Sequence, residues 1–112
     1  LEDFVRKRSP MPDWRTVIRV KDLKDGQGVQ VEAARRLLAV FRVGKEFFAI
    51  SDECPHAGTS LSEGRIEGLC VVCSTHGAAF DLRTGKGSGA LAYGDVTTYS
   101  VRVVGEDIQV LI

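Results

Sequence analysis

From Trp14 to Ile112 the chain is a succession of short β-branched or aromatic runs, separated by turns rich in glycine and aspartate. Runs of this length and spacing favour an antiparallel sandwich or barrel. We therefore expect an all-β antiparallel fold in a single domain over residues 14–112, preceded by a charged arm at 1–13. The expected strands are Thr16–Val20, two strands within Val29–Val43, Glu46–Ile50, Ile66–Val72, Val101–Val104 and Ile108–Ile112.

The segment Val29–Val43 gives conflicting signals. Residues 32–38 are good helix formers, whereas the valines and the phenylalanine around them prefer strands. We place two strands here, with a break near Arg35–Arg36, because Gly44–Lys45 then turns the chain into Glu46–Ile50.

Charge and cysteine content narrow the class of protein. The 15 basic and 15 acidic side chains cancel, so no global field attracts nucleic acid or anionic lipid. No apolar run approaches the roughly 18 residues that span a bilayer. Three cysteines are too few for a disulfide framework and indicate a reducing compartment with metal or redox use. We therefore expect a soluble cytoplasmic domain with neither nucleic acid nor membrane as a partner.

Both histidines and all three cysteines fall between Ser51 and Asp81. Cys54-Pro55-His56 and, after residues 57–72, Cys73-Ser74-Thr75-His76 give the spacing C-x-H followed by C-x-x-H. Two thiolates and two imidazoles suit either a tetrahedral zinc ion or an iron–sulfur cluster with mixed ligands.

The spacing of the four side chains favours the cluster. A zinc finger takes two cysteines from one knuckle and two histidines from a helix, whereas here each loop supplies one of each. Two such loops can face each other across a two-iron cluster, with both cysteines on one iron. Pro55 stiffens the first loop, and Gly58 and Gly77, which follow the histidines, allow tight turns beside a metal.

In this motif the sequence resembles the Rieske family, whose pattern is C-x-H followed by C-x-x-H at about this separation. Phe47–Ile50 and Ala79–Gly85 also resemble the strands that flank the family's loops. The resemblance covers roughly Trp14 to Ile112. It implies a Rieske-type antiparallel sandwich or barrel whose cluster-binding subdomain, about residues 51–81, presents two loops at one tip. It also implies a [2Fe–2S] cluster bound by Cys54, His56, Cys73 and His76.

Departures from the family indicate which kind of member this is. Thr59 and Thr75 stand where members of quinol-oxidising complexes carry a bridging cysteine pair, and Ala78 and Phe80 where they carry hydroxyl donors. Fewer hydrogen bonds to the sulfurs stabilise the reduced cluster less. We expect a potential near the lower end of the range of about −150 to +300 mV. The third loop, residues 85–94, lacks the usual proline, so a more mobile cover is expected.

Nothing in the sequence supplies a separate nucleophile, general base or substrate domain. We therefore expect an electron-transfer component and no catalytic residue. By resemblance, this monomeric carrier takes electrons from a flavin-dependent reductase and passes them to an oxygenase. Three alternatives stay open: the small subunit of an NAD(P)H-dependent nitrite reductase, a structural zinc module, and a Rieske domain cut from an oxygenase catalytic subunit.

Three further features have ordinary interpretations. Cys70 forms a second C-x-x-C pattern with Cys73, and we expect it to be a small buried residue on the strand Ile66–Val72. The glycines of 85–89 are expected to form a plain loop. Asp52, Glu53 and Glu63 either steer a basic partner or are simply solvated.

Overall fold

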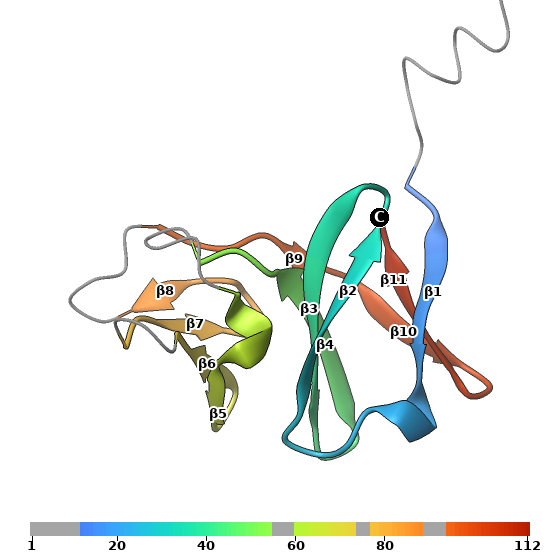
Figure 1. The fold of residues 1–112 in the computed structure, drawn as a ribbon, viewed down its shortest axis with the longest axis horizontal. Helices are drawn as coiled ribbons and strands as arrows, with labels where there is room; N and C mark the ends of the chain where they lie inside the picture. Colours follow the sequence, from blue (N-terminus) through green and yellow to red (C-terminus); the bar gives the residue numbers. More distant parts are fainter. Residues whose placement is uncertain (1–11, 55–59, 74–76, 89–93) are drawn as a thin grey trace, which may run out of the picture.

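The computed structural model describes residues 12–54, 60–73, 77–88 and 94–112, which form three antiparallel sheets (Figure 1). The sheets have the strand orders β1-β11-β10, β2-β3-β4-β9 and β5-β6-β7-β8. The strands are β1 (Trp14–Arg19), β2 (Gly28–Ala33), β3 (Arg36–Val43), β4 (Glu46–Ser51), β5 (Arg65–Glu67), β6 (Cys70–Val72), β7 (Ala79–Asp81), β8 (Gly87–Ser88), β9 (Thr98–Tyr99), β10 (Val101–Val104) and β11 (Asp107–Leu111). Two short 3-10 turns, η1 (Val20–Asp22) and η2 (Leu61–Glu63), complete the described elements. The all-β antiparallel prediction is confirmed.

The second sheet is the middle layer, and Figure 1 shows it between the β1-β11-β10 sheet and the small β5–β8 sheet. Successive side chains of a strand point to opposite faces, so β3 serves two cores. Leu38 and Val40 join Ile108 and Val110 in one buried cluster, which we call the base core. Ala39 and Phe41 join the other cluster, which contains Cys54, Cys73 and Phe80 and which we call the site core.

Burial on both faces explains the conflicting signals of the Val29–Val43 segment. A strand covered on both sides reads as a continuous apolar run and lacks the alternation that marks a half-exposed strand. The predicted pair of strands is confirmed, and the turn between β2 and β3 falls at Ala34–Arg35, one residue before the predicted break.

Two predictions about strands are wrong. Ile66–Val72 is a hairpin, because Gly68 adopts a φ of 63° and turns the chain between β5 and β6. The glycine-rich stretch after residue 85 is more than a loop, since Gly87–Ser88 forms β8 and pairs with β7. Strands of two residues, such as β8 and β9, are too short to give a periodic signal.

Gly85 joins the site core to the chain that leads into β9. It has a φ of 80°, its N–H donates to the Asp81 carbonyl at 2.7 Å, and its own carbonyl accepts from Val96 N–H at 2.8 Å. A Cβ atom placed on Gly85 would overlap the Val96 carbonyl oxygen. Both the dihedral angle and the available space therefore require glycine here.

We predict that Gly85→Ala lowers the free energy of unfolding by about 2–4 kcal/mol, from left-handed strain together with overpacking. Gly105→Ala is the matched control, because Gly105 has a similar φ of 62° but an added Cβ would meet nothing within 4 Å. The control should lose only the strain of about 1–2 kcal/mol. Urea unfolding followed by circular dichroism measures both, and equal losses would show that the close approach to Val96 is unimportant.

Candidate metal centre

Cys54 follows β4 after only two residues and is 1% exposed within the site core. Glu53 and Ser60 form an antiparallel bridge on either side of residues 54–59. The bridge closes the base of this stretch, so Cys54 is held at the start of a closed loop.

Cys73 directly follows β6 and is 3% exposed. Its N–H donates to the Ala78 carbonyl at 2.7 Å, and Gly77 N–H donates back to the Cys73 carbonyl at 3.2 Å. Gly77 has a φ of 73°, as expected for the predicted tight turn. The second loop is therefore also closed at its base, and both loops place a cysteine in the site core.

Asp52, which lies two residues before Cys54, has a role that the sequence did not reveal. It is 2% exposed, although carboxylates are rarely buried without partners. Its Oδ2 accepts from Gln30 Nε2 at 2.5 Å and its Oδ1 from Ser62 N–H at 2.8 Å. Its backbone also pairs, since its N–H donates to the Leu37 carbonyl at 3.1 Å and its carbonyl accepts from Leu61 N–H at 2.6 Å.

The expectation that Asp52 is either solvated or steers a partner is therefore wrong, because the side chain is buried and hydrogen-bonded. It ties the end of β4 to β2 on one side and to η2 on the other, directly before Cys54. A buried side chain with this many partners positions the loop that follows it.

Ala78 and Phe80 are also buried in the site core, at 1% and 0% exposure. These are the two positions at which, by the resemblance described above, other proteins carry hydroxyl donors. Both positions are therefore apolar and packed in the same cluster as Cys54 and Cys73.

Cys70 is separated from the other two cysteines. It is half-buried, not buried as predicted, and it begins β6, where it pairs with Glu67 on one side and Asp81 on the other. It does not belong to the site core that contains Cys54 and Cys73.

The turn after β7 is fixed by an ion pair. Arg83 donates through Nε to Asp81 Oδ1 at 3.3 Å and through a terminal nitrogen to Oδ2 at 3.1 Å. The side-chain hydrogen bonds from Arg83, helped by the backbone N–H of Arg83, lower the pKa of Asp81. The Asp81 carboxylate therefore stays ionised to lower pH than an ordinary aspartate, and the turn keeps this ion pair over the same range of pH.

Several predicted features lie outside the described residues: His56, His76, Pro55, Gly58, Thr59, Thr75 and most of the proposed mobile cover at 89–93. The ends of the cover are described, and Gly87 N–H donates to Asp95 Oδ1 at 2.9 Å across its base. Among the described residues, no group of three or more histidine, cysteine or acidic side chains gathers to hold a metal. The described part thus contains half of the predicted ligand set, the two cysteines.

The described donors fit an iron–sulfur cluster. Thiolates are the ligands that such clusters take from proteins. Each of the two cysteines lies at the base of its own closed loop, and apolar side chains surround both, which keeps water from the two sulfurs.

None of the helical segments that the structure describes is long or apolar enough to cross a membrane.

A family model for the Rieske [2Fe-2S] domain matches residues 13–110 of the chain. The chain is also similar to the 3-phenylpropionate/cinnamic acid dioxygenase ferredoxin subunit of Shigella boydii serotype 4 (strain Sb227). The two are 41% identical over 90 residues, which is 80% of this chain and 84% of that protein.

Solved structures of ferredoxins are also similar to this chain. The ferredoxin of carbazole 1,9a-dioxygenase from Nocardioides aromaticivorans IC177 has a TM-score of 0.84 and 30% identity, covering 88% of this chain and 96% of that one. A ferredoxin-sized match in a complex of reduced oxygenase and oxidized ferredoxin in carbazole 1,9a-dioxygenase has a TM-score of 0.81 and 32% identity. That match covers 88% of this chain and 92% of the other.

Proposed function

This chain belongs to the Rieske [2Fe-2S] domain family, and we propose that it carries single electrons from a flavin-dependent reductase to an oxygenase. It is an electron-transfer component of the ferredoxin type, and its cofactor is a [2Fe–2S] cluster. Membership in this family favours the cluster over the zinc module that the four side chains alone would also allow.

For the ligands we propose Cys54 and Cys73 on one iron and His56 and His76 on the other. The observation that carries the proposal is the burial of both cysteines in one apolar core, each at the base of a closed loop. His56 is two residues after Cys54, and His76 directly precedes Gly77, whose positive φ turns the chain back toward β7.

When bound, the cluster takes up and releases one electron. The chain's own residues hold and shield it. Asp52 fixes the approach to Cys54, the hydrogen bonds between Cys73 and Ala78 fix the second loop, and the site core excludes water from the sulfurs.

The proposed acceptor is a terminal oxygenase. In its support, a similar ferredoxin has been solved in complex with the oxygenase of carbazole 1,9a-dioxygenase, and the 41% identical relative is a dioxygenase ferredoxin subunit. The reductase donor, the cytoplasmic location and the monomeric state belong to the same proposal. So does the division into an arm at 1–13 and one domain at 14–112. The sharing of β3 between the two cores supports the single domain, whereas residues 1–11 of the arm lie outside the described residues and Asp13 pairs with Ile112 through two backbone hydrogen bonds of 3.0 Å.

Anaerobic purification, followed by iron and sulfide assays and EPR before and after reduction, tests the cofactor. NADH with a catalytic amount of a flavin reductase should then bleach the oxidised cluster, and an oxygenase with its aromatic substrate should reoxidise it under oxygen. Zinc without inorganic sulfide would overturn the proposal. Co-purification with a sirohaem subunit and electron delivery to nitrite would instead indicate a nitrite reductase subunit.

We predict a low midpoint potential, because Ala78 and Phe80 give the sulfurs no hydroxyl donor. Phe80→Tyr should raise the potential by about 40–90 mV, since a new hydrogen bond stabilises the more negative reduced cluster. Phe41→Tyr is the control, because Phe41 is buried in the same core but lies on β3. EPR-monitored redox titration measures both, and a wild-type midpoint clearly above zero would contradict the prediction.

A further inference from the structure

A hollow of about 740 Å³ lies where the β2–β3 turn, the start of β1, β9 and the end of β11 meet. Its volume is within the range of about 300–1,000 Å³ typical of small-molecule sites. None of its described lining residues belongs to the two loops that carry Cys54 and Cys73.

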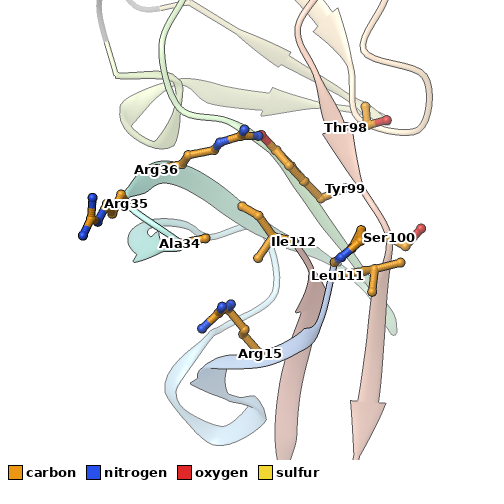
Figure 2. Close-up of a pocket in the computed structure, with 10 residues that line it drawn as sticks. Arg15, Ala34, Arg35, Arg36, Thr98, Tyr99, Ser100, Leu111 and Ile112 are labelled. Carbon is orange, nitrogen blue, oxygen red and sulfur yellow. The ribbon is translucent and has the colours of Figure 1, made fainter. Parts of the chain in front are cut away.

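The lining combines basic and apolar side chains. Figure 2 shows Arg15 and Arg36 on either side of Ile112, whereas Arg35 points away from the hollow. Leu111, Ile112 and the ring of Tyr99 provide apolar surface. Among the described lining residues there is no aspartate or glutamate.

Neither of the two arginines that face the hollow has a carboxylate partner among the described residues. Within the described part of the chain no ion pair is found for Arg15 or Arg36, although Arg19 on the same strand pairs with Glu106 at 3.2 Å. The contact recorded for the Arg36 guanidinium is with the Tyr99 hydroxyl, at 3.5 Å. In a chain whose charges sum to zero, this leaves a local excess of positive charge over an apolar floor.

The backbone beside the hollow is strained. Ala34 and Arg35 have φ values of 51° and 65°, in a two-residue turn that normally takes asparagine or glycine. Strained backbone tends to be kept at binding sites, where the surrounding structure maintains it. Here the full pairing of β2 with β3, down to Ala33 with Arg36, keeps Arg36 at the rim.

From these observations we propose that the hollow binds a small organic carboxylate with an aromatic or branched apolar body. The planar guanidinium forks of Arg15 and Arg36 match a carboxylate. Leu111, Ile112 and Tyr99 match the apolar body, which inorganic anions lack. The hollow also lies near the first loop, because Arg36 and Tyr99 line a second depression together with Asp52 and Glu53.

Titration of the cluster-loaded, oxidised protein with benzoate tests the proposal. Amide resonances of Ser100 and Ile112 should shift in ¹⁵N-resolved NMR spectra and saturate in the millimolar range, as suits so small a ligand. Benzamide has the same shape without the charge, and phosphate has charge without the apolar body. Both should bind at least tenfold more weakly, because benzamide loses the charge-assisted contact and phosphate loses the apolar contact.

Arg15→Gln and Arg36→Gln should each weaken benzoate binding about tenfold. Arg19→Gln, on the same strand but outside the hollow, should leave it unchanged. Arg15 and Arg36 are both exposed, so each variant tests the site even if the other one folds poorly. No shift with benzoate, equal binding of phosphate, equal binding of benzamide, or an equal effect of Arg19→Gln would each overturn the proposal.

Discussion

Replacing Cys73 by serine is expected to yield a protein without its cluster, because the second loop then has no thiolate to offer an iron. Cys54→Ser should have the same result, since the two side chains stand in equivalent places at the bases of the two loops. Iron and inorganic sulfide should fall to background, and dithionite should produce no EPR signal.

Cys70→Ser is the control for both substitutions. Cys70 is chemically identical and only three residues from Cys73, but it is half-buried and outside the site core. This variant should keep full iron and sulfide content and an unchanged EPR signal. A loss of cluster in Cys70→Ser, or its retention in Cys73→Ser, would show that the ligand assignment is wrong.

The second large effect is expected at Asp52. Asp52→Ala leaves the N–H of Ser62 without its acceptor and Gln30 Nε2 with Ser60 Oγ alone, so the free energy of unfolding should fall by about 1–3 kcal/mol. The midpoint of urea unfolding, followed by circular dichroism, measures this loss. Glu53→Ala is the control, because the neighbouring carboxylate is exposed, and it should change stability by no more than about 0.5 kcal/mol.

Asp52→Asn separates the hydrogen bonds from a general effect of burial. The remaining oxygen can accept from Ser62 N–H, and the exposed Gln30 amide can rotate to present its own oxygen to the new amide donor. The asparagine variant should therefore lose clearly less stability than Asp52→Ala, and an equal loss would indicate that these hydrogen bonds do not hold the loop.

Prediction from the sequence succeeded where local chemistry determines the structure. The family resemblance carried by the C-x-H and C-x-x-H motif, the turn at Gly44–Lys45 and the positive φ of Gly77 all depend on short segments. The break between β2 and β3 was placed within one residue, even though Ala34 and Arg35 are unusual in such a turn.

Prediction failed where the structure depends on contacts between segments that are far apart in the sequence. Whether Asp52 is solvated or buried depends on Gln30, which lies 22 residues away and offers no sign of this contact in the sequence. Strands β8 and β9 exist because β7 and β4 provide edges for them to pair with. In Ile66–Val72, by contrast, the apolar residues on both sides of Gly68 outweighed a turn signal that was present.

The alternation of β3 between two cores also has an evolutionary consequence. Inserting or deleting one residue within Leu38–Phe41 would exchange the two sets of side chains, so Ala39 and Phe41 would enter the base core while Leu38 and Val40 faced the cysteines. Both cores would be mispacked by a single event. Length variation in descendants of this chain should therefore accumulate in the turns, while the number of residues in β3 stays fixed.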